Sequence, residues 1–256
     1  MPAHTRAIEG PIKATTRSMA IIEEIQRRDG SGVSELANHF GFSKSTVHDH
    51  LQTLQNCGYL KREGEEYVLT LRFLTLGGHA QSRNVLYRLA KGEVDDLASE
   101  TGETAKIAVL YGSKALYLYQ ARSELGVRTD SHVGTRVYMH STALGKAILA
   151  QLSEARVREI LDENGMPRRT DRTITDEEVL FDELDDIRER GYAFDDQERI
   201  DGICCIAAPI TTEDPVVGSI SVSGPAKRIN SEGERSTLVD LVRDTARILE
   251  IKMKYS

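Results

Sequence analysis

The stretch from Val33 to Gly58 constrains the fold most, because its apolar residues define two short one-sided helices joined by a tight turn. Gly41 ends the first helical segment, Ser43 is a good N-cap residue for the second, and Gly58 ends the second. The apolar residues recur at the spacing of one helix face, at Val33, Leu36, Ala37 and Phe40 and then at Val47, Leu51 and Leu54. Two helices of this kind predict a helix-turn-helix.

The outer face of the second predicted helix carries short polar side chains, which suit base edges in a major groove. A polar helix face is more often simply solvated, so the next segment matters. Residues 59–62 and 66–69 are β-prone runs around Glu63-Gly64-Glu65, and they predict the hairpin of a winged helix. We therefore predict a surface that binds double-stranded DNA. Its expected contacts are Arg17, Ser43, Lys44, Ser45, Thr46, His48, Asp49, Gln52, Lys61 and Arg62.

The charge distribution places this contact in the first third of the chain. Residues 1–80 carry nine Lys or Arg and nine Asp or Glu, so residues 81–256 carry the whole net charge of −7. An acidic segment repels phosphate, which confines nucleic acid to the N-terminal domain. Within that domain we expect Lys44 to contact phosphate, while Ser45, Thr46, His48 and Gln52 approach bases.

Length and cysteine usage exclude several classes of protein. A chain of 256 residues is long enough for two domains. It has no apolar run of about 18 residues and no basic-then-apolar leader, so we expect a cytoplasmic protein with no membrane contact. The three cysteines, Cys57, Cys204 and Cys205, lack the spacing of a disulfide framework or a metal site. No metal or cofactor is predicted.

The remainder of the chain alternates between helical and strand-like segments. After a first domain of residues 1–80, which ends in an apolar joint at 71–78, helical spacing over residues 81–100 predicts a linker helix. Residues 101–256 form the second domain, where capping boxes at Thr175/Glu178 and Ser231/Glu234 predict two helix starts. The predicted strands are 106–111, 115–120, 203–210 and 216–223, and further helices are predicted over 141–151 and 153–162. Hairpin-joined strands interleaved with helices predict an α+β fold.

Three stretches of the second domain can carry chemistry, and each also has an ordinary explanation. His140–Lys146 opens a helix with small residues, which either exposes backbone N–H groups to an anion or is a plain cap. One of Cys204 and Cys205 can face a pocket, although a buried cysteine is most often an apolar filler. Alternate serines at 219, 221 and 223 share one strand face, which either meets a polar ligand or is solvated.

In this order, these segments resemble the IclR family of transcriptional regulators over nearly the whole chain. The matching residues are ELANHFGFSKSTVHDHLQTL with GYL (35–54 and 58–60), TGET (101–104), HSTALGKAILA (140–150), RGYAFDDQE (190–198), GICCIAAPI (202–210) and SISVSGP (219–225). The resemblance implies a winged helix-turn-helix domain joined by the linker helix to a GAF-like ligand-binding domain. It also implies a homodimer, or a dimer of dimers, on a palindromic operator.

The resemblance implies as well that a small-molecule effector, a carboxylate or a sugar-derived acid, modulates operator binding. Carried over by motif, the ligand contacts are Ala143, Leu144, Gly145, Asp195, Cys205, Ser221 and Ser223. The chain departs from the family at Asp49, where Arg is usual after His, and in its acidic wing. A carboxylate does not bind phosphate and accepts a hydrogen bond only from a base such as cytosine. The operator sequence of relatives therefore does not transfer.

Two rival functions remain at this point. One is an enzyme that uses Cys205 or a serine as nucleophile, with the helix-turn-helix as a partner module, although no general base lies near these residues in the sequence. The other is a redox sensor built on Cys204 and Cys205, although vicinal cysteines on a strand diverge and pair poorly. The leading prediction is a ligand-responsive transcription factor without catalytic activity.

Overall fold

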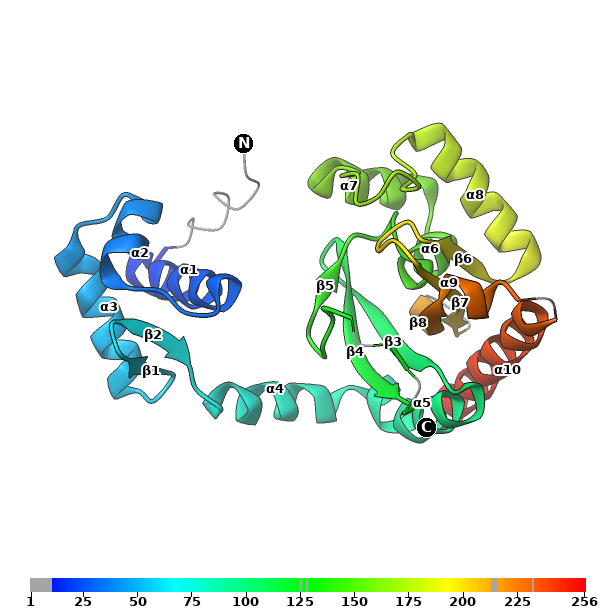
Figure 1. Ribbon diagram of the computed structural model, residues 1–256, viewed down its shortest axis with the longest axis horizontal. Coiled ribbons are helices and arrows are strands. Elements are labelled where there is room, and N and C mark those ends of the chain that lie inside the picture. The colour runs from blue at the N-terminus through cyan, green and yellow to red at the C-terminus, as the bar shows by residue number, and fades with distance from the viewer. Residues whose placement is uncertain (1–10, 125, 128, 213–215, 232) are drawn as a thin grey trace. The chain divides into compact units, whose positions relative to one another are not determined.

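The computed structural model describes residues 11–124, 126–127, 129–212, 216–231 and 233–256. The chain divides into two compact units with the boundary between Ala80 and Gln81 (Figure 1). Within the described residues, no helix combines the length and the apolar composition needed to cross a membrane.

The first unit is a three-helix domain with a small hairpin. It contains α1 (Lys13–Arg28), α2 (Val33–Phe40), α3 (Lys44–Asn56) and the antiparallel pair β1 (Leu60–Glu63) and β2 (Glu66–Leu69). Its core gathers the apolar positions of the two sequence patterns, Leu36, Ala37, Val47, Leu51 and Leu54, with Ile21, Ile25, Leu60 and Tyr67. The predicted helix-turn-helix and wing are both present.

The turn between α2 and α3 follows the predicted chemistry. Gly41 has a φ of +69°, a left-handed conformation that glycine adopts without strain. The Ser43 hydroxyl accepts a hydrogen bond from the Thr46 N–H at 3.1 Å, which satisfies a free backbone donor at the start of α3. The segment therefore folds from local signals.

The link between the units differs from the sequence prediction. The segment expected as an apolar joint is α4 (Arg72–Arg83), and α5 (Val85–Thr101) follows it. Asn84 separates them, because its extended backbone and its side-chain oxygen, which accepts from the Tyr87 N–H, make it the N-cap of α5. The predicted linker helix over 81–100 is therefore interrupted at Asn84, and its residues 81–83 belong to α4.

The second unit is built on a six-stranded antiparallel sheet in the order β5-β4-β3-β8-β7-β6. The strands are β3 (Thr104–Tyr111), β4 (Lys114–Arg122), β5 (Arg136–Val137), β6 (Ala193–Asp196), β7 (Ile203–Thr211) and β8 (Val216–Pro225). The helices are α6 (Ala143–Leu149), α7 (Glu154–Asn164), α8 (Glu177–Arg190), α9 (Ala226–Ile229) and α10 (Glu234–Lys254). The mixture of helices and hairpin-joined strands confirms the predicted α+β class.

The two faces of this sheet bury different side chains. Ile220 and Val222 of β8 point into a core shared with α5 and α10, which lie against one face (Figure 1). The opposite face packs against α6, α7 and α8, with Leu144, Ile148 and Leu184 in its core. Since side chains alternate along a strand, the serines of β8 lie on this second face. The alternation therefore turns the serine row toward α6.

Two helix starts differ from the predicted capping boxes. Asp176, not Thr175, caps α8, because its carboxylate accepts from the backbone N–H groups of Glu178 and Val179. The helix α10 begins after Gly233 without a side-chain cap, and the Ser231 hydroxyl instead donates to the Arg228 carbonyl. Both capping-box predictions were wrong, for different reasons: a neighbouring carboxylate caps α8, whereas the Ser231 hydroxyl is engaged away from the start of α10.

Candidate DNA interface and ligand cavity

The predicted reading helix, α3, buries one face and exposes the other. Val47, Leu51 and Leu54 are buried. The predicted contacts Lys44, Ser45, His48, Asp49 and Gln52 are all exposed, and Thr46 is partly buried. A two-turn row of solvent-facing polar groups on the second helix of a helix-turn-helix is the geometry that reads a major groove.

Several of the predicted DNA contacts are engaged within the domain. The Ser43 hydroxyl lies 2.9 Å from that of Ser45 and 2.8 Å from that of Thr46 as part of the cap. Arg17 of α1 lies over the Phe42 ring at 4.8 Å, beside the start of α3. Gln52 donates to the Asn56 side chain at 3.0 Å. These contacts fix the orientation of the groups at the beginning of α3.

The wing carries its own counter-charges. Lys61 pairs with Glu63 at 2.6 Å and Arg62 with Glu65 at 3.1 Å, and all four side chains are largely exposed. Any phosphate contact by these two cations has to compete with the wing carboxylates. Lys44 is different, because no ion pair links it to another residue that the structure describes. We therefore regard Lys44 as the better phosphate contact.

Six of the seven predicted ligand contacts line one cavity in the second unit. The cavity lies between α6, the end of β6 and the strands β3, β7 and β8, and it encloses about 20 Å³, room for about one water molecule. It brings together Ala143, Leu144, Asp195, Cys205, Ser221 and Ser223 with Lys106, Tyr117, Thr129, Thr142, Arg199, Ile200 and Ile203. A metabolite can enter only if part of this wall moves.

Gly145 does not line the cavity, so that prediction was wrong. Its backbone N–H donates to the Thr142 hydroxyl at 3.1 Å, which leaves it unavailable to a ligand. A Cβ at this position would lie 2.2 Å from the Met139 carbonyl oxygen. Glycine is therefore needed here for close packing of α6 against the preceding chain.

The serine row is divided between structural and free hydroxyls. Ser219 donates to the Leu144 carbonyl at 3.0 Å and Ser223 to the Thr104 carbonyl at 3.3 Å. Ser221 lines the cavity, and its hydroxyl has no hydrogen bond to another described residue. Of the two serines predicted to contact a ligand, Ser221 therefore keeps a free hydroxyl and Ser223 does not.

The two cysteines lie on opposite faces of β7. Cys204 is in the core against α5 and α10, whereas Cys205 lines the cavity. Burial raises the pKa of both thiols, that of Cys204 to about 12. A thiol that stays protonated is a poor nucleophile and is slow to oxidise. In the described chain, no cluster of three His, Cys, Asp or Glu residues is placed to hold a metal ion.

Comparison with known proteins assigns the family. Residues 14–64 match the IclR helix-turn-helix domain, and residues 78–251 match the C-terminal domain described as bacterial transcriptional regulator IclR. The chain belongs to the IclR family. Its second unit is accordingly the effector domain of an IclR-family regulator, which confirms the resemblance seen in the sequence.

Individual relatives agree with the family assignment. The chain is 33% identical to the regulator KdgR of Escherichia coli over 247 residues, 95% of this chain and 94% of KdgR. It is 34% identical to the Escherichia coli transcriptional repressor IclR, over 89% of this chain and 85% of that protein. The crystal structure of Thermotoga maritima IclR has a TM-score of 0.74 and 29% identity, covering 94% and 97% of the two chains. The chain is thus a DNA-binding transcriptional regulator and not an enzyme.

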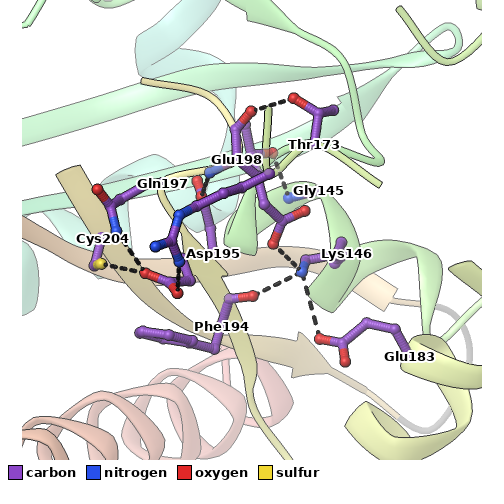
Figure 2. Close-up of polar contacts among 12 residues, drawn as sticks. Gly145, Lys146, Thr173, Glu183, Phe194, Asp195, Gln197, Glu198 and Cys204 are labelled. Carbon is purple, nitrogen blue, oxygen red and sulfur yellow. Dashed lines mark hydrogen bonds and ion pairs between the residues drawn. The ribbon is translucent and has the colours of Figure 1, made fainter. Parts of the chain in front are cut away.

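A buried ion-pair network supports the wall of the IclR-family effector domain (Figure 2). Lys146 of α6 is 1% exposed, and its ammonium donates to the Phe194 carbonyl at 2.7 Å and to Glu198 Oε1 at 2.6 Å. It also lies 3.4 Å from Glu183 of α8. The Glu198 N–H donates to Asp195 Oδ1 at 2.7 Å. The network therefore joins the helix that carries Ala143 and Leu144 to the strand end that carries Asp195.

The carboxyl of Asp195 is perturbed by this environment. The side chain is 2% exposed, and burial together with the nearby Glu198 carboxylate raises its pKa to about 7. Backbone N–H groups of Glu198 and Arg199 oppose that rise in the pKa by donating to the ionised form. Near neutral pH, Asp195 can therefore either accept or donate a hydrogen bond toward the cavity.

Sequence reasoning missed two cations in the cavity wall, Lys106 and Arg199. Lys106 is a lone charged residue inside the apolar strand β3, on the side opposite to the buried Ile107, and this was a usable signal. Arg199 follows β6 in a turn, and nothing in the sequence places it beside β3. The sequence prediction also missed the role of Lys146, because the partners of its ammonium lie 37 to 52 residues further along the chain.

Proposed function

We propose that this chain binds a palindromic operator in double-stranded DNA and that a small organic acid in the effector cavity changes its operator affinity. The main evidence for an acidic ligand is the burial of Lys106, which is 4% exposed. Its ammonium has no hydrogen bond or ion pair to any residue in the described part of the chain, and it lies 5.3 Å from the centre of the Tyr117 ring. Because an unpaired buried ammonium is costly, a carboxylate at this position is strongly favoured.

The DNA half of the proposal rests on α3. Lys44 at its N-terminus is placed to neutralise a phosphate, and Ser45, His48 and Gln52 face outward at the spacing of base contacts. This function belongs to the cytoplasm, where the operator is accessible. The polar groups specify the sequence, while Lys44 supplies affinity that does not depend on sequence.

We propose a homodimer because α4 presents apolar side chains without a cover. Among its described residues none is buried, and Leu74 and Leu76 are 68% and 54% exposed, next to Leu71 at 81%. A row of exposed leucines of this kind marks a protein-protein contact. Two copies joined there present two reading helices, which a palindromic site requires. Sedimentation should give a dimer or a dimer of dimers, and a monomer at micromolar concentration contradicts the pairing.

A ligand screen tests the effector half. Thermal-shift measurements with mono- and dicarboxylic acids and sugar acids identify binders, which calorimetry then quantifies on wild type and Lys106→Met. Loss of a hydrogen bond to a charged group costs roughly 1.5–3 kcal/mol, so the affinity should fall at least tenfold. Lys114→Met is the matched control, because Lys114 of the adjacent strand β4 contacts the Tyr138 ring and lies outside the cavity.

The bound acid should be recovered unchanged after incubation. The proposal fails if no acid binds, or if Lys106→Met binds the acid as tightly as the wild type does. Chemical conversion of the acid would contradict its role as an effector.

A further inference from the structure

Two buried cations face the effector cavity from different depths. Lys106 is 4% exposed and lies across from Ser221 in the register of β3 and β8. The Arg199 side chain is 13% exposed, so it lies nearer to solvent on the same wall. Burial lowers the pKa of Lys106, and the Arg199 charge acts in the same direction. The Arg199 charge therefore adds to the cost of keeping the Lys106 ammonium ionised in the cavity.

The cavity wall contains less negative charge than positive charge. Among the described residues of the lining, Asp195 is the one carboxylate, against Lys106 and Arg199. No ion pair links Asp195 to either cation among the residues that the structure describes, and its carboxyl accepts from the Glu198 N–H instead. Because burial raises the pKa of Asp195 to about 7, this group neutralises at most part of the excess. A ligand with one negative charge at Lys106 leaves Arg199 to the Asp130 carboxylate alone.

Arg199 has a partner that is readily exchanged. Its guanidinium binds Asp130 at 2.8 Å, and the Asp130 side chain is 66% exposed. Because the Asp130 carboxylate is largely in water, a ligand anion can replace it without leaving an unpaired carboxylate buried. The released Asp130 remains in water and stays solvated. A ligand anion that replaces Asp130 would draw Arg199 away from its present position, which would enlarge a cavity of about 20 Å³.

We propose that the effector of this chain is an acid with two anionic groups, one bound by Lys106 inside the cavity and the other bound by Arg199 nearer the surface. This rests on the proposed function and names the ligand class for the same cavity. The Ser221 hydroxyl, beside Lys106 in the sheet, donates to the inner anionic group, and a protonated Asp195 donates to the ligand as well. Dicarboxylates and phosphorylated acids belong to this class.

Calorimetry on the full chain with charge-matched probes tests the inference. The dianionic probes are succinate, malate and 2-oxoglutarate, and the monoanionic probes are monomethyl succinate, lactate and pyruvate. We expect the best dianionic probe to bind at least tenfold more tightly than any monoanionic probe. Arg199→Gln should weaken the dianionic probe at least tenfold and change monoanionic binding less than twofold.

Two further variants complete the design. Lys106→Met should weaken both classes of probe, because both place a carboxylate on that ammonium. Arg172→Gln is the control for loss of an arginine, since Arg172 pairs with Asp196 at 2.5 Å and lies outside the cavity lining. It should leave both affinities unchanged, and unchanged thermal unfolding of Arg199→Gln should show that its effect is local.

The outcomes separate the two proposals. If a monoanionic acid binds best, depends on Lys106 and is indifferent to Arg199→Gln, the dianion inference is wrong while the proposed function stands. If no probe of either class binds, the proposed function and this inference fail together.

Discussion

The buried pair of Lys146 and Glu198 gives the sharpest stability prediction. In Lys146→Met the Phe194 carbonyl and Glu198 lose their donor, while Glu183 keeps Arg190 as partner at 2.8 Å. Glu198 is 5% exposed, and its Oε2 already lacks a hydrogen-bond partner among the described residues. The substitution therefore leaves a carboxylate buried and without compensation. Removal of one partner of a buried pair costs about 3–5 kcal/mol, which lowers the Tm of a unit of this size by roughly 6–20 °C.

The loss should depend on pH in a defined direction. Burial raises the pKa of Glu198, and Lys146 opposes that rise. Without Lys146 the pKa of Glu198 rises further, so the folded state prefers the protonated carboxyl more strongly than the unfolded chain does. Stability from such a group is fully present below its unfolded pKa and is lost as pH rises through its folded pKa. Lys146→Met should therefore cost more at pH 8 than at pH 5.

Chemical denaturation followed by tyrosine fluorescence measures this loss, because seven of the nine tyrosines lie after residue 80. Arg156→Met is the surface control, since Arg156 and Glu159 are 39% and 64% exposed and their pair is worth at most about 1 kcal/mol. The double variant Lys146→Met with Glu198→Leu should recover most of the loss, because no charge then remains buried. A loss below about 1 kcal/mol for Lys146→Met, or a double variant less stable than either single one, refutes the reasoning.

Three further predictions concern the DNA interface and the cavity. Lys44→Ala should weaken binding to all DNA sequences about equally and lower the salt slope by about one, measured by fluorescence anisotropy; a loss confined to the operator contradicts a phosphate contact. Asp49 is 84% exposed, so Asp49→Arg should raise affinity for any DNA by adding a cation that can contact phosphate. A loss of roughly 1–3 kcal/mol at the operator alone shows instead that Asp49 reads cytosine. The pKa of Asp195 is raised from 3.8 to about 7 in the folded state, so protonation of this carboxyl favours folding. As pH rises from about 4 to about 7, wild type should therefore lose stability relative to Asp195→Asn, which does not titrate. Denaturation at pH 5 and pH 8 measures this, and a difference independent of pH contradicts it.

Local patterns in the sequence predicted the first domain well. The spacing of Val47, Leu51 and Leu54, the Ser43 cap and the Gly41 turn are all decided by residues within a few positions of one another. Four predicted strands of the second domain, which are β3, β4, β7 and β8, and the α+β class followed for the same reason, whereas β5 and β6 were not predicted. The start of α8 was misplaced by one residue, because Asp176 offers a carboxylate acceptor beside Thr175.

Only those residues of the cavity that belong to local sequence motifs were predicted. The alternation of β8 placed Ser221 on the correct face, and the family motif chose Cys205 over Cys204. Nothing local indicates that Arg199 lies beside Lys106, 93 residues earlier in the chain, because that proximity depends on the strand order of the sheet. The charge of the cavity, and with it the ligand class, is therefore a property of the tertiary structure.

Coupling between ligand and DNA tests the central claim most directly. A DNA fragment selected by the protein from a random-sequence pool is titrated by fluorescence anisotropy with and without the tightest-binding acid, for wild type and Lys106→Met. We expect equal DNA affinity for both proteins without the acid. With the acid, at a concentration that saturates wild type but not the variant, the midpoint should shift at least fivefold for wild type and remain unchanged for Lys106→Met. An equal shift in both proteins, or no shift in wild type at saturating acid, contradicts control of DNA affinity by an acid bound at Lys106.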